Sequence, residues 1–448
     1  MKTVLKNFRL VDENTDRPGT VIIENGTIND VIYRKEGTET AETSFYRATP
    51  EIIVDGKDRL VLMPAFVDLH AHFRDSLIYD QSFPSETQFP SETVESASMS
   101  AAAGGYGTVV CMANTKPVTD SVVMAKSIKD RSDKLGLVDL YPVLSLTKNM
   151  DGRELSEITL LNKSEQLQSN SAEKTYMPLM LSEDGKDPAD DDLFLSAMKE
   201  AKRLGLPVSC HCDLGDYRGD EAEAVRRVIE LGKKAGCHIH IAHISTRETA
   251  EVIRAEKARA QNGGTGNGFK LSCEVMPHNL CLTEADAEKL GRESWGRVNP
   301  PLRKDHDREA LAFALQDGTI DAIATDHAPH TDKDKDNGVP GFTAFETAFA
   351  SVYTDLIFQK NKNAKLNLSA LSFLMSAKPA RLIGKENDRG LLKAGYRADL
   401  VIIDIDKSWE VNKAAFLSRG KNTPFRDKVL YGKILMTLHS GRVVFNSL

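Results

Sequence analysis

Histidine and aspartate side chains recur at the ends of apolar, strand-like segments of this sequence. In residues 67–72, the period of two of a β-strand places Asp68, His70 and His72 on one face. Four more such residues follow other apolar segments: Asp184, His211, His243 and Asp326. Imidazole nitrogens and carboxylate oxygens are ligands that suit Zn²⁺ and similar divalent ions. The pattern therefore predicts a metal site, provided that these segments end at a common place.

The number of candidate ligands bears on the kind of site. His70 or His72 alone would more often be a hydrogen-bonded core residue than a ligand. The six candidates at strand ends exceed the needs of one tetrahedral ion, so they suit a two-metal centre with one carboxylate shared between ions about 3.5–4 Å apart. The remaining predictions place His238 and His240 in the interior behind the ligands, and His306 and His439 at the surface.

Strand and helix patterns alternate through the middle of the chain and would position these side chains. Amphipathic stretches predict helices at residues 94–103, 122–135, 192–204, 221–235 and 247–260. Apolar stretches predict eight strands, at residues 65–73, 107–112, 139–146, 175–181, 207–211, 238–243, 270–275 and 321–325. We therefore expect an α/β fold, a (β/α)8 TIM barrel, whose chemistry lies at the C-terminal ends of its strands.

Both ends of the chain have a different character, with short strands and tight turns. They predict strands at residues 3–8, 19–24, 28–33, 398–403, 428–439 and 442–445. Because neither end alone would bury much surface, we expect both to form one small β-sandwich domain. The predicted division assigns residues 1–60 and 385–448 to this domain and residues 61–384 to the barrel.

Composition limits the partners and the location of the protein. With 58 Lys+Arg and 65 Asp+Glu the formal net charge is −7, which argues against nucleic acid as a partner. No apolar run approaches the length of a membrane span and the N-terminus has no secretory h-region, so we expect a cytoplasmic protein without membrane contact. The six cysteines lack paired C-x-x-C spacing and are expected to be reduced core residues.

Several motifs resemble, in order, those of one enzyme family. Residues 63–75 read Met-Pro-Ala-Phe-Val-Asp-Leu-His-Ala-His-Phe-Arg-Asp, and residues 297–304 read Arg-Val-Asn-Pro-Pro-Leu-Arg-Lys. Residues 324–330 read Ala-Thr-Asp-His-Ala-Pro-His. Shorter matches lie at residues 111–115, 182–185, 242–246 and 422–425. Over nearly the whole chain, these motifs resemble the long type of bacterial dihydroorotase in the amidohydrolase superfamily.

The resemblance implies a role for the residues that carry it. It implies Zn²⁺, one or two ions per subunit, held by six ligands: His70, His72, Asp184, His211, His243 and Asp326. Asp184 would bridge two ions, and Asp326 would also be the catalytic base and then the acid. Six further residues are implied in substrate binding, the first three of them around a substrate carboxylate: Arg74, Asn114, His330, Asn299, Pro340 and Gly341.

The resemblance also implies a reaction and partners. The reaction is the metal-dependent, reversible hydrolysis of the cyclic amide of (S)-dihydroorotate to N-carbamoyl-L-aspartate, a step of de novo pyrimidine (UMP) biosynthesis. The implied partners are this small-molecule substrate, a second copy of the chain in a homodimer, and aspartate transcarbamoylase.

Two alternatives stay open at this point. A hydantoinase- or dihydropyrimidinase-like cyclic amidase would act on uncharged rings, but such enzymes typically use a carboxylated lysine on strand four, and residues 176–182 contain no lysine. A catalytically silent scaffold would keep the fold but would not need all six ligands.

The chain also departs from the family pattern in places. It has Ser76–Leu77 after the first motif, an extra stretch over residues 78–91, and Glu183 where the family has aspartate. Residues 331–342 are rich in charge and contain two glycines, and we expect them to form a lid over bound substrate.

Overall fold

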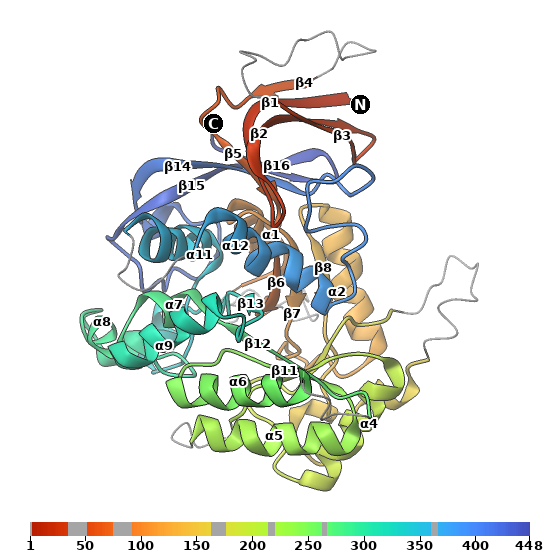
Figure 1. Ribbon diagram of the computed structural model, residues 1–448. Coiled ribbons are helices and arrows are strands. Elements are labelled where there is room, and N and C mark those ends of the chain that lie inside the picture. Colours follow the sequence, from red (N-terminus) through yellow and green to blue (C-terminus); the bar gives the residue numbers. More distant parts are fainter. Residues whose placement is uncertain are drawn as a thin grey trace, which may run out of the picture.

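The computed structural model describes residues 2–34, 52–74, 92–162, 176–213, 220–261, 267–359 and 366–448. Figure 1 shows two regions, a barrel surrounded by helices and, above it, a sheet that contains both ends of the chain. Ser76–Leu77 and the extra stretch over residues 78–91 lie outside the described residues.

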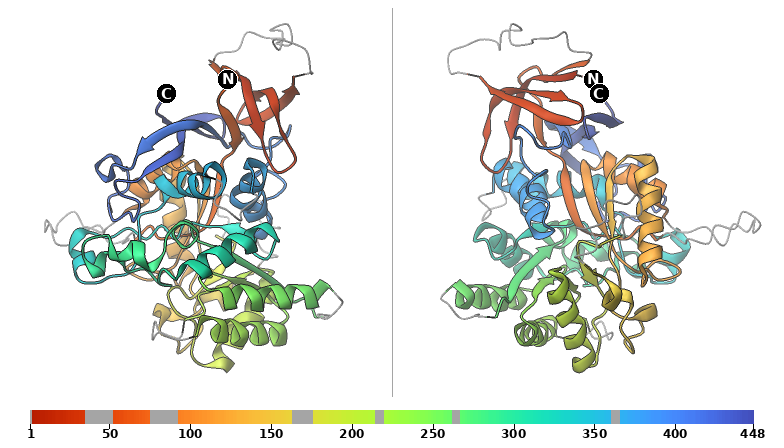
Figure 2. Two further views of the ribbon diagram at one scale, coloured as in Figure 1. Left: turned by 60° about the vertical axis from the view of Figure 1, so that its left-hand side comes forward. Right: turned by 90° about the vertical axis from the view of Figure 1, so that its right-hand side faces the viewer.

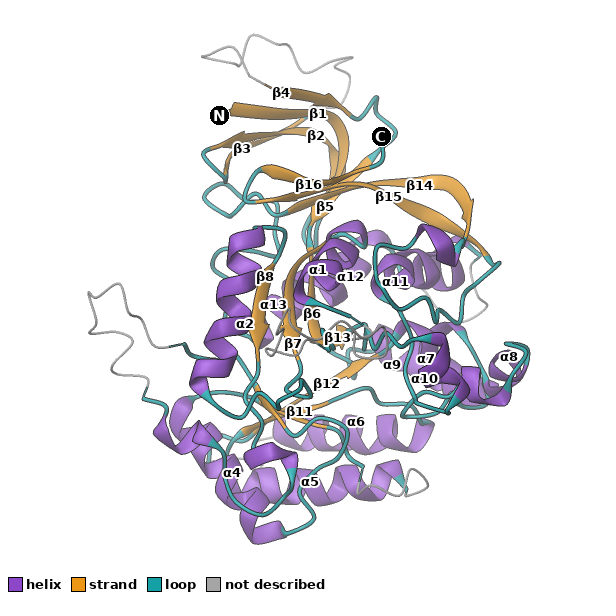
Figure 3. Ribbon diagram, turned by 180° about the vertical axis from the view of Figure 1, so that it is seen from behind, coloured by secondary structure: helices purple, strands orange, loops and turns teal. Residues whose placement is uncertain are grey.

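Strands from both ends of the chain form the sheet beside the barrel. Its hydrogen-bonded order is β16-β15-β14-β5-β1-β2-β3, with β4 paired to β1. The two ends join where β5 pairs with β14 in antiparallel fashion (Figure 3). The bounds are β1 Lys2–Val11, β2 Asp16–Glu24, β3 Thr27–Tyr33, β4 Ile52–Asp55, β5 Val61–Pro64, β14 Leu400–Glu410, β15 Val429–His439 and β16 Arg442–Asn446. The expected union of both ends in one β unit is confirmed.

The described strands form one continuous hydrogen-bonded sheet, and apolar side chains from both of its ends, such as Leu10 and Leu438, pack in one cluster. One detail of this sheet differs from the expectation. It extends past the predicted boundary at residue 60, because β5 pairs with β1 and β14 before the chain enters the barrel. Residues 61–63 are fully buried apolar residues, which the sequence pattern alone cannot assign to one region or the other. The predicted boundary at residue 385 stays a prediction.

Eight parallel strands form the barrel. One barrel sheet has the hydrogen-bonded order β6-β7-β8, and the other has the order β9-β10-β11-β12-β13. The parallel bridges Leu144–Leu181 and Ala71–His327 close the two gaps between these sheets. The bounds are β6 Phe66–Ala71, β7 Tyr106–Cys111, β8 Asp139–Pro142, β9 Leu181–Ser182, β10 Val208–Cys210, β11 His238–Ile241, β12 Lys270–Val275 and β13 Ala322–Ile323. The predicted (β/α)8 barrel is confirmed.

Helices surround these strands, as the two views of Figure 2 show. The five predicted helices are α1 Val94–Ala103, α2 Val122–Leu135, α4 Asp191–Leu204, α5 Glu221–Ala235 and α6 Arg247–Gln261. Later residues add α7 Pro277–Cys281, α8 Glu284–Glu288, α9 Asp305–Gln316, α10 Asp332–Asp336, α11 Phe345–Val352, α12 Leu368–Ser372 and α13 Lys378–Leu382. Short 3₁₀ or π segments are η2 Lys148–Met150, η3 Glu157–Leu160, η4 Glu293–Gly296, η5 Tyr353–Phe358, η6 Phe373–Ala377 and η7 Lys413–Ala415.

Local signals in the sequence explain where the helices begin and end. Asp190 and Asp220 accept hydrogen bonds from the first backbone N–H groups of α4 and α5. Gly136, Gly205 and Gly236 follow α2, α4 and α5 in the left-handed conformation, which glycine adopts without steric cost. Because both kinds of signal are local, the predicted bounds of these helices agree closely with the structure.

The fourth barrel strand requires a correction. The sequence predicts an extended strand over residues 175–181, but β9 contains only Leu181 and Ser182. Pro178 lies just before it, and proline has no backbone N–H to donate to a sheet. The strand therefore begins after the proline and pairs with its neighbours over a short length.

Predictions about individual side chains had different outcomes. His439 is predicted at the surface, but it is only 5% exposed and contacts Asp139 and Asp399, because the end of β15 packs where the terminal sheet meets the start of β8. The side chain of His306 is exposed, as predicted. All six cysteines are free, five of them are buried and Cys281 is half-buried, so the expected core position holds for five of the six.

Candidate metal centre

The C-terminal ends of the barrel strands meet at one pocket. Its lining contains all of the predicted metal ligands: His70, His72, Asp184, His211, His243 and Asp326. It also contains every residue assigned to substrate binding: Arg74, Asn114, Asn299, His330, Pro340 and Gly341. Sequence reasoning missed the remaining lining residues, Gly185, Ala328 and Val339, which have no chemistry of their own to mark them. The barrel thus brings the whole predicted site together.

The candidate ligands lie close to one another. His72 Nε2 lies 2.9 Å from Asp326 Oδ1, and His211 Nδ1 lies 3.0 Å from His243 Nε2. Two groups of three residues have ligand atoms within 4.8 Å of one another, and both contain His70: His70, His211 and His243, and His70, His72 and Asp326. Two overlapping groups match the expectation of a centre that could hold two ions.

Asp184 lies between these two groups. Its Oδ1 is 3.7 Å from His70 Nε2 and 3.5 Å from His211 Nε2, and its Oδ2 is 3.7 Å from His72 Nδ1. Its two oxygens therefore approach members of both groups, which is the arrangement that a bridging carboxylate needs.

The charge states of these groups suit a divalent cation. Burial favours the neutral acids of Asp184 and Asp326, but the surrounding histidines outweigh burial and hold the pKa of both carboxyl groups well below the usual range. Burial lowers the pKa of His211 and His243, which keeps their lone pairs free for a metal. Burial opposes a charge on His70 as well, but Asp184 and Glu274 raise its pKa, so the field at this histidine favours a cation. The donor set therefore fits a divalent metal ion.

Three residues of the pocket have strained backbone. Arg74, His243 and Asp326 have φ angles of 54°, 33° and 45°, in the left-handed region that non-glycine residues seldom adopt. Such residues cost about 1–3 kcal/mol each and persist where the surrounding structure holds them in place. Here each lies just after a barrel strand, so the strain directs its side chain into the pocket.

The residues assigned to substrate lie on one side of the pocket. Arg74 Nη2 is 3.4 Å from His330 Nε2, and His330 Nε2 donates to the carbonyl oxygen of Pro340 over 2.9 Å. Burial lowers the pKa of His330 to about 3, helped by the nearby charge of Arg74, so this imidazole is neutral. Arg74 Nε is buried and has no hydrogen-bond partner in the part of the chain that the structure describes, whereas Asn114 Oδ1 accepts from His72 Nδ1 over 2.9 Å. A guanidinium with an unused donor thus lies beside the candidate ligands.

Sequence reasoning missed a carboxylate behind His70. His70 Nδ1 donates to Glu274 Oε1 over 2.8 Å, and His240 Nε2 donates to Glu274 Oε2 over 3.0 Å. His240 Nδ1 and His238 Nε2 each lie 2.8 Å from Ser272 Oγ. The interpretation of His240 as a residue behind the ligands is confirmed, whereas His238 is half-buried and lies one contact farther away. The signal for Glu274 is its place in a buried predicted strand, where an unpaired charge is rare.

Two more buried acids hold the backbone next to Asp326. Asp68 accepts from the Thr325 backbone N–H over 2.9 Å and from its hydroxyl over 2.5 Å. Glu92 Oε2 lies 3.4 Å from His327 Nε2 and also accepts from the Ser418 hydroxyl. The strand period places Asp68 on the interior face, but no local pattern in the sequence predicts the contact between Glu92 and His327.

The expected lid segment lies against this pocket. Within residues 331–342, α10 is followed by Val339, Pro340 and Gly341, which line the pocket. Lys335 in α10 is fully buried, with contacts to backbone carbonyl groups. Closure of this segment over substrate stays a prediction.

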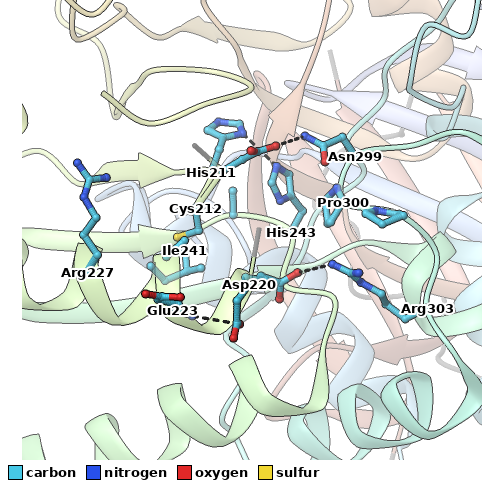
Figure 4. Close-up of a pocket in the computed structure, with 15 residues that line it drawn as sticks. His211, Cys212, Asp220, Glu223, Arg227, Ile241, His243, Asn299, Pro300 and Arg303 are labelled. Atoms are coloured by element: carbon cyan, nitrogen blue, oxygen red, sulfur yellow. Dashed lines mark hydrogen bonds and ion pairs between the residues drawn. The ribbon is translucent and has the colours of Figure 1, made fainter. Parts of the chain in front are cut away.

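A second pocket adjoins the first (Figure 4). It shares His211, His243 and Asn299 with the metal pocket. In it Asn299 Nδ2 donates to Asp213 Oδ2 over 3.0 Å, and Arg303 Nη2 lies 3.6 Å from Glu221 Oε2. Because the Asn299 amide already has a protein partner, its expected contact with substrate stays a prediction.

Known proteins resemble this chain over its whole length. The model of the Amidohydrolase family matches residues 61–444. A dihydroorotase of Clostridium botulinum is 34% identical over 452 residues, which cover 99% of this chain and 100% of that protein. A dihydroorotase of Aquifex aeolicus is 32% identical over 470 residues, 99% of each chain. This chain belongs to the amidohydrolase family, among the dihydroorotases.

Solved structures of other amidohydrolases share its fold. The L-hydantoinase of Arthrobacter aurescens has a TM-score of 0.80 at 23% identity and covers 99% of this chain and 96% of its own. The dihydropyrimidinase of Brevibacillus agri has a TM-score of 0.76 at 19% identity, with 100% and 95% covered. At such identities the likeness bears on the fold alone.

Two further observations characterise this amidohydrolase. No lysine is found among the described residues that line the metal pocket, and Asp184 lies between the two histidine groups. Over the described part of the chain, no helix combines the length and the apolar character needed to span a membrane.

Proposed function

We propose that the protein is a dihydroorotase, which reversibly hydrolyses the cyclic amide of (S)-dihydroorotate to N-carbamoyl-L-aspartate. The observation that carries this proposal is Arg74, which lines the same pocket as the candidate metal ligands and whose buried Nε has no hydrogen-bond partner among the described residues. A guanidinium pairs with a carboxylate through two parallel hydrogen bonds. An amide ring that bears a carboxylate therefore suits this pocket better than an uncharged ring does.

Six residues would hold the metal in this proposal: His70, His72, Asp184, His211, His243 and Asp326. Nitrogen and oxygen donors of this kind suit zinc, and we propose one or two Zn²⁺ ions per subunit. When bound, the metal would lower the pKa of a water molecule and polarise the amide carbonyl.

The side chains of the protein would then move the proton and hold the substrate. Asp326 is ionised, because the neighbouring histidines keep the pKa of its carboxyl group low, and it would take a proton from the attacking water. As the amide C–N bond breaks, Asp326 would return that proton to the leaving ring nitrogen. Arg74 would bind the substrate carboxylate, with Asn114 and His330 beside it.

Turnover with and without metal tests the proposal. We expect the purified protein to interconvert dihydroorotate and N-carbamoyl-L-aspartate, to lose this activity after treatment with a chelator, and to regain it with Zn²⁺. Elemental analysis of the same samples gives the number and identity of the ions. Absence of turnover with the metal present would contradict the proposal and favour a catalytically silent scaffold.

Substitution of Arg74 separates this proposal from a hydantoinase-like activity. Arg74→Gln should raise KM for dihydroorotate by about 10- to 100-fold, as expected for loss of hydrogen bonds to a charged group. Uncharged hydantoin or dihydropyrimidine rings provide the comparison. Efficient hydrolysis of these rings, unaffected by Arg74→Gln, would favour the hydantoinase-like alternative.

Substitution of Asp326 tests its role as base and acid. Asp326→Ala should lower kcat by at least about 100-fold, the lower end of the effect of a positioned general base, and leave the circular dichroism spectrum unchanged. Metal content is measured in parallel because Asp326 is also a candidate ligand. Near-normal turnover in this variant would contradict the assigned role.

The remaining expectations concern partners and location. We propose a homodimer and an association with aspartate transcarbamoylase, both supported by the resemblance to the long dihydroorotases. Sedimentation of the protein alone and mixed with that enzyme tests both. A cytoplasmic location is proposed on the absence of an apolar, membrane-length run in the sequence.

A further inference from the structure

Helix α10 contains a fully buried lysine at the rim of the metal pocket. Lys335 is 0% exposed, while Lys333, two positions earlier on the same short helix, is exposed. Lysine is almost never fully buried unless its charge is compensated. The contacts of its ammonium group therefore indicate what this residue is for.

The ammonium group of Lys335 uses all three of its hydrogens on backbone oxygens. Nζ donates to the carbonyl groups of Arg297 over 2.9 Å, Val339 over 3.0 Å and Gly341 over 3.1 Å. It also lies 5.4 Å from the centre of the Phe342 ring. Among the described residues no carboxylate forms an ion pair with it, so its charge is balanced by these three carbonyl dipoles.

Two of these three carbonyl groups belong to the wall of the metal pocket. Val339 and Gly341 line the metal pocket, and Pro340 between them accepts a hydrogen bond from His330 Nε2. Lys335 ties both sides of Pro340 to Arg297, whose carbonyl also accepts from the Gly341 backbone N–H over 3.1 Å. One buried cation thus determines where the acceptor of His330 lies.

A neighbouring side chain, Asn422, also holds this wall. Asn422 Nδ2 donates to the Gly341 carbonyl over 2.8 Å, and Asn422 Oδ1 accepts from the His330 backbone N–H over 2.9 Å. Gly341 itself has φ +135°, and a Cβ there would lie 2.8 Å from Ala328 Cβ, so the wall packs against the chain that follows Asp326. The segment has little room to move as a unit.

We infer that Lys335 is a positioning residue, which holds residues 339–341 as a fixed wall of the substrate pocket and thereby orients His330. This inference rests on the proposed function, and it differs from the expected lid, because a closing segment would have to break these contacts in each cycle. Lys335 is not among the described residues that line the metal pocket. Its loss should therefore weaken substrate binding and leave the chemical step largely intact.

Three variants test this inference. Lys335→Met keeps the length of the side chain without its donors, Lys335→Gln keeps two donors, and Lys333→Met removes an exposed charge from the same helix. We expect KM for dihydroorotate to rise by about 10- to 100-fold in Lys335→Met, which is the effect that a small misplacement of binding groups causes. The rise should be smaller in Lys335→Gln and absent in Lys333→Met. We expect kcat and metal content to stay within about threefold of the wild type in all three.

Amide hydrogen exchange supplies a readout that needs no activity. The backbone N–H groups of Val339 and Gly341 donate to Asp334 and Arg297, and their exchange should be at least about tenfold faster in Lys335→Met than in the wild type or Lys333→Met. If Lys335→Met fails to fold, KM and amide hydrogen exchange are both measured on Lys335→Gln instead.

The outcomes separate this inference from the proposed function. Unchanged KM and unchanged exchange in Lys335→Met would overturn the positioning role, as would a fall in kcat without a rise in KM. A failure of the proposed function would appear instead as absent turnover in the wild type, and exchange of residues 339–341 would still report whether Lys335 holds the wall.

Discussion

His70 has different partners at its two ring nitrogens. Its Nε2 faces Asp184 at 3.7 Å, and its Nδ1 donates to Glu274 over 2.8 Å. Burial disfavours the charged form of Glu274, but His240 and His70 outweigh burial and hold its pKa low, so this buried carboxylate accepts from Nδ1 of His70 and leaves Nε2 directed at the pocket. At the scale of single residues, the metal site thus depends on side chains that do not line it.

Glu274→Gln is expected to weaken metal binding. A glutamine amide has one oxygen, so it would accept from only one of His70 and His240, and its N–H₂ group would face the other. The orientation of His70 would therefore be lost. We expect metal affinity to fall by about 10- to 100-fold, measured by calorimetric titration of the metal-free protein with Zn²⁺. Ser272→Ala, one step farther from the metal, is the control and should bind Zn²⁺ like the wild type. Equal affinities for wild type and Glu274→Gln would contradict this role.

His238 should contribute to loss of stability in acid. Burial, together with the nearby His240, lowers the pKa of His238 from 6.5 to about 3. Between these two values the unfolded chain binds the proton and the folded chain does not, so the free energy of unfolding falls as pH decreases from 6.5 towards 3. At pH 5 the loss from this residue is about 1–2 kcal/mol.

The measurement compares urea unfolding of the wild type and His238→Gln at pH 7 and pH 5. We expect the variant to lose less stability than the wild type between these two pH values. His306→Gln, at an exposed position, is the control and should lose as much as the wild type. An identical loss in His238→Gln and the wild type would contradict the assignment.

At the scale of elements, the close contact of α1 with α11 supports the strand end that bears Asp326. The His327 ring stacks on Phe345, the first residue of α11, with ring centres 4.2 Å apart. Gly104, which ends α1, has ordinary helical φ, but a Cβ there would overlap the Phe345 carbonyl group, with the carbonyl carbon at 2.8 Å. Glycine is therefore required at this position by the approach of two helices.

Gly104→Ala is expected to destabilise the protein by about 1–3 kcal/mol, the usual cost of overpacking. The physical reason is that the added methyl group meets backbone, which cannot rotate away. Urea unfolding measures the change, with Met99→Ala as the control, since Met99 lies on α1 and is 41% exposed. A stability equal to that of the wild type would show that α1 and α11 separate without cost.

The local signals at element ends explain which elements the sequence predicts well. Helices α1, α2, α4, α5 and α6 begin and end close to their predicted bounds. Strand β9 does not, because its length depends on pairing with Leu144, just after β8, and with β10, which the apolar character of residues 176–180 does not reveal. Strand β5 is apolar like a barrel strand, but it pairs with β14 in the terminal sheet, and its apolar character does not reveal this pairing.

At the scale of the whole molecule, a buried ionic cluster joins the terminal sheet to the barrel. Arg389 is 4% exposed, and its Nη1 donates to Asp139 Oδ2, at the start of β8, over 2.9 Å. Arg397 also pairs with Asp139, and His439 at the end of β15 lies 3.5 Å from it. Burial opposes ionisation of Asp139, but the two arginines outweigh it and hold the pKa of this carboxyl group below its ordinary value.

Arg389→Met should lower the free energy of unfolding by about 3 kcal/mol, because it leaves part of the charge of the largely buried Asp139 carboxylate without a partner. Arg226→Met removes one partner of an exposed ion pair with Glu248 and should cost less than about 1 kcal/mol. Urea unfolding at pH 7 measures both. Equal effects of the two substitutions would contradict the view that this cluster joins the two regions.

The sequence by itself determined the fold class and the residue types of the site. Strand period placed His70 and His72 on one face, and chain order placed the other candidate ligands after strands, because both relations are local. Only the tertiary structure decided which atoms meet. His72 and Asp326 are 254 positions apart and lie 2.9 Å from one another because bridges between strands far apart in the chain close the barrel. The burial of Lys335, Glu274 and His439 was likewise decided by packing between distant segments, which no local pattern encodes.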